Sequence, residues 1–218
     1  MEEDRIRDLH RLLIEEYGRV QRPETEDGVR QLLATILSQN VADTNTRRAV
    51  RNLDSAYYSY KEVEEDSVED LADVIRPAGL PETKARRLQN ALSRIREETG
   101  GEYTLAFLNE KSTDNAREWL QEIKGVGPKT ANVVLNFHFE RPTIAVDTHV
   151  QRLAERFRLI PDGTTNEQAH EMLNEQVPDD MKYELHHLLI QHGKDACTAQ
   201  SPNCDNEICR AFCSCDEC

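Results

Sequence analysis

The stretch LQEIKGVGPKTANVV, residues 120–134, joins two helical segments through a turn that contains two glycines. The first helix is expected to end before the glycines. Pro128 suits the first position of the next helix, where a missing N–H costs nothing. Gly125 and Gly127 let the backbone approach another molecule closely. Because free N–H groups at a helix start attract anions, Gly125, Val126 and Gly127 form a candidate phosphate site.

The rest of the chain also shows the spacing of amphipathic helices. Apolar residues recur three and four positions apart, beginning with Val29, Leu32, Leu33, Ile36 and Leu37. Asp43 is placed to cap the following helix. Helices are expected at about 29–37, 43–53, 71–75, 85–95, 114–123, 128–138, 147–158, 165–176 and 180–192. No stretch alternates with a period of two, so the expected fold class is all-α.

The composition is that of a soluble globular protein. Hydrophobic residues make up 38% and charged residues 31% of the 218 residues. No apolar run approaches the roughly 18–20 residues that a membrane span needs. The acidic start MEEDRIRDLH is neither a secretory signal nor an Arg-rich transit peptide. We therefore expect a cytoplasmic protein with no membrane partner.

The formal net charge of −14 is unfavourable for binding a polyanion, but the charges are unevenly spread. Acidic residues crowd the segment 62–73. The segment 84–96 contains no acid and carries Lys84, Arg86, Arg87, Arg94 and Arg96. A local basic face can bind phosphate while the rest of the surface stays acidic. Lys84 and Arg86 are therefore candidate contacts to a nucleic-acid backbone, and a solvated helix face is the alternative.

Lys129 follows the glycine turn and falls in the first turn of its helix. A cation at that end opposes the helix dipole, so the position favours a neutral amine, which is what a nucleophile needs. The alternative is a lysine that contacts phosphate beside the glycines. A glycine turn of this kind is the helix–hairpin–helix pattern, which grips a DNA backbone without reading its sequence.

Asp147 lies eighteen residues further on, before the apolar positions Val150, Leu153 and Phe157 of another helix. Capping that helix is one role that fits. The separation from Lys129 also allows an antiparallel return that brings amine and carboxylate to one cleft. An amine can attack the sugar carbon that bears a damaged base, while a carboxylate accepts its proton or stabilises the cationic sugar. The pair therefore predicts base excision through a Schiff base, followed by elimination of the 3′ phosphate.

Five motifs together resemble the endonuclease III family of helix–hairpin–helix DNA glycosylases. They are LLATILSQNVADTN (32–45), GLPETKARRL (79–88), IKGVGPKTANVVLN (123–136), PTIAVDTHVQR (142–152) and HHLLIQHGKDAC (186–197), in the family's order. The resemblance implies an enzyme that excises oxidised pyrimidines and then cleaves the abasic strand. It places the family's catalytic lysine on Lys129 and its catalytic aspartate on Asp147. Sister families that only remove the base lack this lysine, so its presence favours the bifunctional type.

The resemblance also implies an architecture and a partner. We expect one helical lobe from 27–141, with the hairpin, and a second from 1–26 plus 142–218. A monomer is expected to bind double-stranded DNA with a damaged base or abasic site across the cleft between the lobes. Base excision flips the nucleotide out, so another group must fill the gap in the stack. Gln39 and Asn40 lie where the family places a polar wedge, and amides that end a helix are the alternative.

All six cysteines lie in the last 22 residues. Clustered thiols in a cytoplasmic protein indicate a metal site before disulfides, and four thiolates suit zinc or an iron–sulfur cluster. The family carries a [4Fe–4S] cluster here, with six, two and five residues between its ligands. Glu207 stands at the expected third position, whereas five residues separate Cys209 from Cys215. The expected ligands are Cys197, Cys204, Cys209 and Cys215, with Cys213 and Cys218 as alternatives within the segment 197–218.

Two other functions remain open from the sequence. A glycosylase acting on uracil or mismatched thymine would use the same fold with a different pocket. A damage-sensing module without chemistry would keep the hairpin and the cluster. The Lys129 and Asp147 pair argues against such a module, because binding a DNA backbone needs neither residue.

Overall fold

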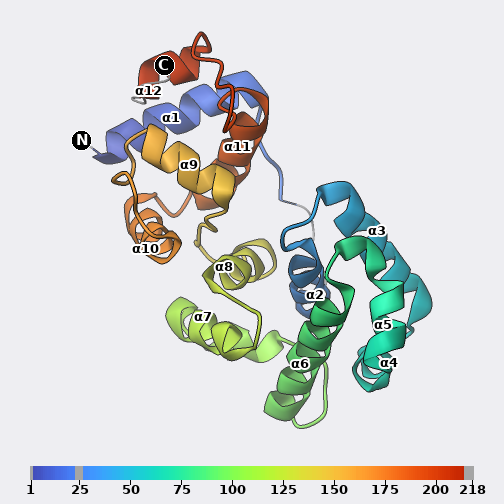
Figure 1. Cartoon of the computed structure of the whole chain (residues 1–218). Helices are drawn as coiled ribbons and strands as arrows, with labels where there is room; N and C mark the ends of the chain where they lie inside the picture. Colours follow the sequence, from blue (N-terminus) through green and yellow to red (C-terminus); the bar gives the residue numbers. More distant parts are fainter. Residues whose placement is uncertain (1, 23–26, 214–218) are drawn as a thin grey trace. The chain divides into compact units, whose positions relative to one another are not determined.

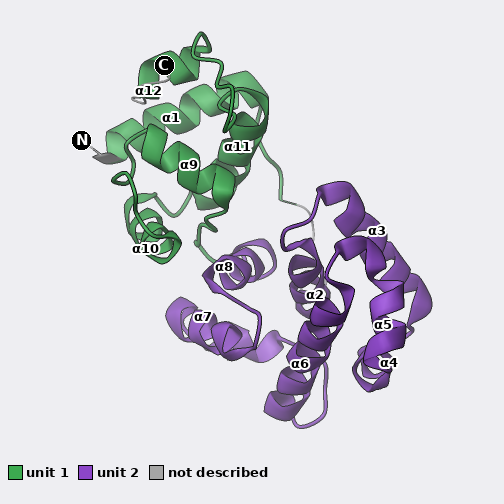
Figure 2. Ribbon diagram, in the orientation of Figure 1, with its two compact units in different colours: residues 1–23, 141–218 green, residues 24–140 purple. Residues whose placement is uncertain are grey.

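The computed structural model describes residues 2–22 and 27–213, and it is built of helices (Figure 1). No strand occurs in this described part of the chain, and the predicted all-α class is confirmed. The chain forms two compact units, each with its own apolar core (Figure 2). Glu24–Glu140 is called the central unit here. Met1–Pro23 and Arg141–Cys218 together are called the terminal unit.

The central unit begins with α2 and ends with the glycine hairpin between α7 and α8. Its elements are α2 (Gly28–Ser38), α3 (Asp43–Ala56), α4 (Tyr60–Glu65), α5 (Val68–Val74), η1 (Arg76–Ala78), α6 (Pro81–Thr99), η2 (Ala106–Glu110), α7 (Thr113–Glu122) and α8 (Pro128–Phe137). Short polar side chains satisfy the amides that helix starts leave without acceptors. Asp27 accepts from the N–H groups of Val29 and Arg30, and Ser67 caps α5 in the same way.

Helix α6 is the largest contributor to the packing of the central unit, where it contacts α5, α4 and α2. Its buried apolar positions repeat at the spacing of one helix face: Ala85, Leu88, Ala91, Leu92 and Ile95. The hairpin helices α7 and α8 pack on each other, and α8 also packs on α2. The hairpin therefore shares a core with α2, whose C-terminal turn carries Gln39 and Asn40.

The terminal unit combines the first helix with the last four. These are α1 (Glu2–Tyr17), α9 (Thr148–Arg156), α10 (Asn166–Gln176), α11 (Lys182–Asp195) and α12 (Glu207–Phe212). Helix α11 packs against both α9 and α1. The buried apolar side chains of α1 are Ile6, Leu9 and Leu13, at three- and four-residue spacing. A capping box formed by Thr165 and Gln168 begins α10.

Some local expectations differ from the structure. Asp43 is the first residue of α3, and the cap residue is Ala42, which makes no side-chain hydrogen bond to the helix start. The six-residue helices α4 and α12 were not predicted, because such short segments show too little periodicity. None of the helices among the described residues is both long and apolar enough to cross a membrane.

Candidate DNA-binding and catalytic site

The glycine hairpin turns sharply between α7 and α8. The N–H of Val126 donates to the Ile123 carbonyl at 2.9 Å, and Val126 buries its side chain against the core. Gly125 has a φ of +96°, a conformation that residues with a Cβ rarely adopt. Gly127 is exposed, and a Cβ added there would meet no atom within 4 Å. The turn therefore leaves open space in front of the first amides of α8, as a phosphate site requires.

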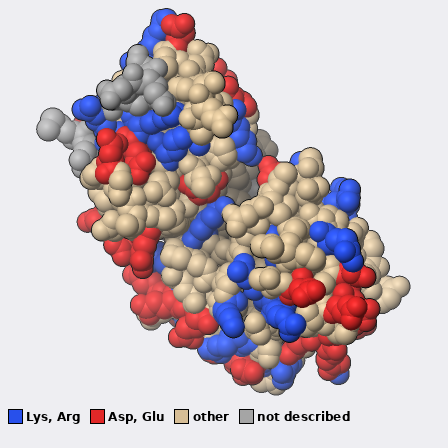
Figure 3. All heavy atoms as spheres, viewed as in Figure 1, with Lys and Arg blue, Asp and Glu red and all other residues tan. Residues whose placement is uncertain are grey.

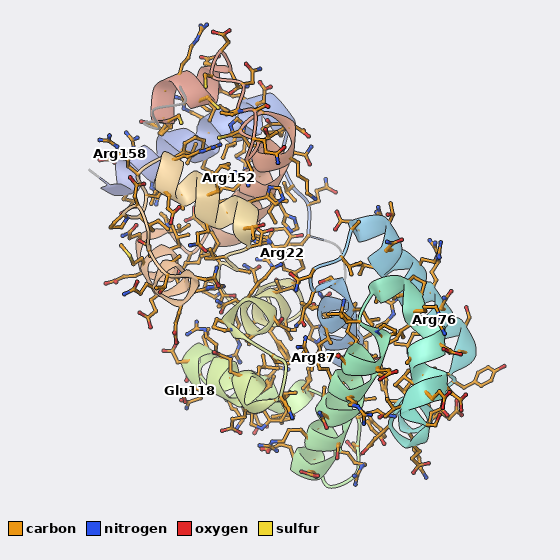
Figure 4. The ribbon with its side chains drawn as sticks, viewed as in Figure 1. Arg22, Arg76, Arg87, Glu118, Arg152 and Arg158 are labelled. Atoms are coloured by element: carbon orange, nitrogen blue, oxygen red, sulfur yellow. The ribbon has the colours of Figure 1, made fainter. Side chains whose placement is uncertain are left out.

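A hydrogen-bond network fixes this hairpin from behind. The Gln39 amide donates to the carbonyl of Gly125 at 3.0 Å and to Oγ1 of Thr130 at 3.2 Å. Arg87, which extends from α6 (Figure 4), donates from Nη1 to Oε1 of Gln39 at 2.6 Å. A Cβ added to Gly125 would lie 2.7 Å from Cδ of Arg87. The glycine is thus required by its backbone conformation and by its neighbour.

Lys129 is the second residue of α8 and is exposed. Proline at position 128 and glycine at position 127 precede it, so its side chain stands beside the amides that have no acceptor within the helix. The structure therefore places the predicted nucleophile at the predicted phosphate site. The roles of nucleophile and phosphate contact are both compatible with this position.

Asp147 is the N-cap of α9 and is half-buried. Its Oδ1 accepts hydrogen bonds from the N–H groups of His149 at 2.9 Å and Val150 at 2.8 Å. None of the described residues of the terminal unit donates a hydrogen bond to Oδ2 of Asp147. Capping therefore occupies one oxygen of the carboxylate and leaves the other for a second role, so the two roles considered for Asp147 are compatible.

Arg152 lies in the middle of α9 (Figure 4) and binds the end of α11 and the first cysteine of the cysteine segment. Its Nη2 donates to the carbonyls of Gly193 at 2.8 Å and Cys197 at 3.0 Å, and it lies 3.2 Å from Nδ1 of His149. Burial lowers the pKa of Arg152, although a guanidinium stays protonated at any physiological pH. These contacts tie the helix that Asp147 caps to the loop that Cys197 begins.

Two exposed residues with left-handed backbones lie in neighbouring turns of the central unit. Asn40 follows α2 with a φ of +56°, and Leu80 precedes α6 with a φ of +47°. A Cβ added to Gly79 would touch Cγ2 of Val41 at 3.5 Å, so the two turns lie side by side. Leu80 is 67% exposed, which is unusual for a large apolar residue in a strained backbone. Sequence reasoning missed Leu80, although its position between Gly79 and a proline indicated an exposed turn.

The candidate contacts on α6 divide into two kinds. Arg86 is exposed and remains a candidate contact to DNA phosphate. The prediction for Lys84 is wrong, because its side chain is only 2% exposed. Its Nζ donates to the carbonyls of Leu37 at 2.7 Å, Gln39 at 2.8 Å and Ala78 at 2.7 Å. Burial, with a smaller contribution from Arg87, lowers the pKa of Lys84 to about 8, so at neutral pH the amine keeps all three protons.

The cysteine segment lies partly within the described chain. Cys197 and Cys209 are buried in the terminal core, and Cys204 and Cys213 are half-buried. Arg156 donates from Nη1 to Sγ of Cys197 at 3.2 Å, and Nε2 of His192 lies 3.5 Å from Sγ of Cys209. Cys215 and Cys218 lie outside the described residues. No group of three or more metal-binding side chains is assembled among the residues that the structure describes.

The surface carries both signs of charge despite the net charge of −14. On the face shown in Figure 3, Lys and Arg side chains lie next to Asp and Glu side chains, so positive and negative charge are interspersed. Two arginines on α6 are paired with acids: Arg94 contacts Glu98 and Glu122, and Arg96 contacts Glu64. The C-terminal half of α6 therefore offers less positive charge to DNA than its sequence suggests.

Comparison with known proteins agrees with this architecture. The sequence pattern of the HhH-GPD superfamily of base excision DNA repair proteins matches residues 33–179. Endonuclease III of Thermotoga maritima is 31% identical over 208 residues, which cover 95% of this chain and 92% of that protein. Endonuclease III of Escherichia coli (strain K12) is 35% identical over 182 residues, covering 84% of this chain and 81% of that protein.

Solved structures give the same result. A non-covalent endonuclease III–DNA complex superposes with a TM-score of 0.82 at 27% identity, covering 99% of this chain and 95% of that chain. A trapped endonuclease III–DNA covalent intermediate gives the same TM-score and identity. This chain belongs to the HhH-GPD superfamily of base excision DNA repair proteins. Within this superfamily the chain is a homologue of endonuclease III, which confirms the family predicted from its motifs. The prediction that the protein is an enzyme of base excision repair is also confirmed.

Proposed function

We propose that this chain is a bifunctional DNA glycosylase and abasic-site lyase that removes oxidised pyrimidines from double-stranded DNA. The observation that carries the proposal is the exposed Lys129 in the first turn of α8, directly after the glycine hairpin. The hairpin amides would bind the backbone phosphate and so bring the damaged nucleotide to the Lys129 amine. The likeness to a trapped endonuclease III–DNA covalent intermediate supports a covalent route.

The chemistry follows from an amine and a carboxylate. Nζ of Lys129 bonds to C1′ of the sugar, the bond from C1′ to the base breaks, and the base leaves with a proton. The sugar ring opens to give an imine between lysine and sugar. Loss of a proton from C2′ then expels the 3′ phosphate and nicks the strand. Asp147 would accept the amine proton or stabilise the cationic sugar through Oδ2, while Oδ1 keeps its bonds to α9.

Extrusion of the nucleotide leaves a gap in the base stack. Asn40 is exposed, whereas the Gln39 amide is bound to the hairpin, so we assign the polar wedge to Asn40. Leu80 would insert beside it, since exposed apolar side chains are the usual wedges between base steps. Gln39 then acts behind the surface, where it fixes the hairpin.

The cysteine segment suits a [4Fe–4S] cluster held by Cys197, Cys204, Cys209 and Cys215. Thiols are the donors that such clusters require, and two of the four are already buried in the terminal core. The Arg156 guanidinium next to Cys197 Sγ complements the negative charge of a metal-bound sulfur. When bound, the cluster would supply a fixed fold for the C-terminal loop. Arg152, which binds the carbonyls of Gly193 and Cys197, would transmit that order to α9.

Borohydride trapping tests the proposed function. The wild type is incubated with a duplex that carries one oxidised pyrimidine, and borohydride reduces any Schiff base to a stable covalent band. We expect the band with the wild type and with Lys124→Ala, an exposed lysine of the same hairpin, and none with Lys129→Ala. Base release without trapping would make Lys129 a phosphate contact. Parallel duplexes with uracil or mismatched thymine test the other glycosylases, and binding without release of any base would favour a damage-sensing module.

A further inference from the structure

The ammonium group of Lys84 joins the two turns that carry Asn40 and Leu80. We propose that Lys84 is a positioning residue for nucleotide extrusion: it holds both turns in one fixed arrangement, so that Asn40 and Leu80 enter the base stack together. This inference rests on the proposed function, because it assigns the two wedges a shared support. It replaces the phosphate contact predicted for Lys84.

The contacts of Lys84 divide between the two turns. Its Nζ donates to Leu37 and Gln39 on the side of Asn40, and to Ala78 on the side of Leu80. The backbone N–H of Lys84 also donates to the carbonyl of Leu80 at 3.0 Å. Lys84 therefore binds the chain within three residues before each wedge, and its backbone binds Leu80 directly.

The charge and number of protons suit this role. The carbonyls at the C-terminal end of α2 receive no hydrogen bond from within the helix and lie at the negative end of its dipole. A cation is therefore favourable there. Three N–H donors meet three carbonyls, and a neutral side chain would leave buried acceptors without partners. An ammonium is more compact than a guanidinium and reaches all three from one point.

Backbone strain at Asn40 and Leu80 is a second reason to assign Lys84 a positioning role. Asn40 and Leu80 both have positive φ values, +56° and +47°, and neither is glycine. Such conformations persist only where the surrounding structure determines them. The carbonyls that Lys84 binds belong to residues one and three positions before Asn40 and two positions before Leu80. Loss of the ammonium would allow both turns to relax toward ordinary backbone conformations and withdraw the two side chains.

The test measures stack disruption separately from chemistry. A duplex carries an uncleavable 2′-fluoro analogue of an oxidised pyrimidine nucleotide, with 2-aminopurine in the opposite strand as a fluorescent reporter of lost stacking. With Lys84→Met we expect little of the fluorescence increase that the wild type gives. On a cleavable duplex, single-turnover excision should slow by about 10²-fold, as expected for misplaced groups. The Kd for undamaged duplex should stay within about twofold, since phosphate contacts supply that affinity.

Two comparisons separate positioning from simple loss of stability. Ile95→Val lies on the same helix, is buried and is absent from both turns, so it should lower the Tm and keep the fluorescence signal. In an Asn40→Ala/Leu80→Ala background, adding Lys84→Met should change the excision rate by less than about twofold, because it acts through those residues. Lys84→Gln, which retains two N–H donors, should be intermediate, and it carries the test if Lys84→Met does not fold.

The outcomes are distinct. A wild type that excises no base contradicts the proposed function and leaves the stacking measurement to decide the role of Lys84. A wild type that excises normally, together with full fluorescence for Lys84→Met, overturns the positioning role. The positioning role would also be overturned if Ile95→Val reduced the fluorescence increase as much as Lys84→Met does at an equal decrease in Tm. Stability alone would then explain the effect.

Discussion

Arg87 donates a hydrogen bond to Gln39 at 2.6 Å, and the same arginine fills the space beside Gly125. Through Gln39 it also reaches the Gly125 carbonyl and Thr130, so three segments far apart in the sequence meet at one amide side chain. The hairpin is therefore not a free loop on the surface. Its shape is set by α6 and by the end of α2.

Replacing Gly125 by alanine should weaken DNA binding beyond its effect on stability. The new Cβ would displace Arg87, and the φ of +96° is unfavourable for alanine. We expect DNA affinity to fall about tenfold, equivalent to roughly 1.4 kcal/mol. Gly100→Ala is the matched control, because Gly100 also has a positive φ and no atom near its added Cβ. Both variants should lose roughly 1 kcal/mol of stability, and unchanged DNA binding by Gly125→Ala would contradict the role of the network.

Asp147→Asn should separate the capping role of Asp147 from its proposed chemical role. Asparagine caps helices as well as aspartate, so the free energy of unfolding should change by less than about 0.5 kcal/mol. The amide cannot accept a proton, and excision should slow by roughly 10²–10⁴-fold. Asp147→Ala should show the same slow excision and lose about 1 kcal/mol of stability as well. The control is Thr165→Ala, which removes the cap of α10 and should affect stability alone. Normal excision by Asp147→Asn would remove Asp147 from the chemistry.

The cysteine assignment predicts different results for two neighbouring positions. Cys209 is buried and Cys213 is half-buried, and only Cys209 belongs to the proposed ligand set. In anaerobically purified protein, Cys209→Ser should lose iron, sulfide and visible absorbance, whereas Cys213→Ser should keep them. Removal of iron by a chelator should loosen the C-terminal loop, which limited proteolysis would detect. Stoichiometric zinc without iron would contradict the cluster, and the reverse pattern of the two variants would move the ligand to Cys213.

Stability of the terminal unit should decrease as the pH falls below neutrality, partly through His10. Burial lowers the pKa of His10 below its ordinary value of 6.5. The carboxylate of Glu184, whose Oε2 lies 3.0 Å from Nε2 of His10, raises the pKa but does not outweigh burial. The unfolded chain therefore binds a proton more readily than the folded chain. The contribution of His10 to stability is present above about pH 6.5 and is lost as the pH falls below that value.

Urea denaturation between pH 7 and pH 5 checks this sign. The free energy of unfolding should fall more steeply with decreasing pH for the wild type than for His10→Gln, which cannot titrate. The carboxylates are common to both proteins, so the difference between the slopes isolates His10. Equal slopes would show that protonation of His10 costs the folded state nothing.

The helical fold could be predicted because apolar spacing is preserved along most of the chain. The stripe Val29, Leu32, Leu33, Ile36 and Leu37 is buried as expected. The glycine hairpin was also predictable, since only glycine accommodates the turn at position 125 and only a helix start favours proline at 128. The exact caps were less predictable: Asp43 enters α3 rather than capping it, because the preceding residue already has the extended backbone of a cap.

Lys84 shows why the candidate site was only partly predictable. Its basic neighbours suggested an exposed face, but Lys84 lies four, seven and eleven residues before Leu88, Ala91 and Ile95, on the buried stripe of α6. That spacing indicated a buried cation. The carbonyls that accept hydrogen bonds from the Lys84 ammonium belong to residues up to 47 positions away in the sequence, and no local pattern reveals them. The exposure of Leu80 likewise depends on packing that the sequence does not encode locally.

The terminal unit combines residues from before and after the central unit, and this order has a consequence during synthesis. Helix α1 is translated before residues 24–140, but its packing partner α11 is translated after them. The central unit can fold while it emerges from the ribosome. Ile6, Leu9 and Leu13 meanwhile have no apolar surface of their own unit to cover them. A ribosome that stalls before residues 182–195 would therefore hold a folded central unit joined to a helix with an exposed apolar face. Such a face is a binding site for chaperones.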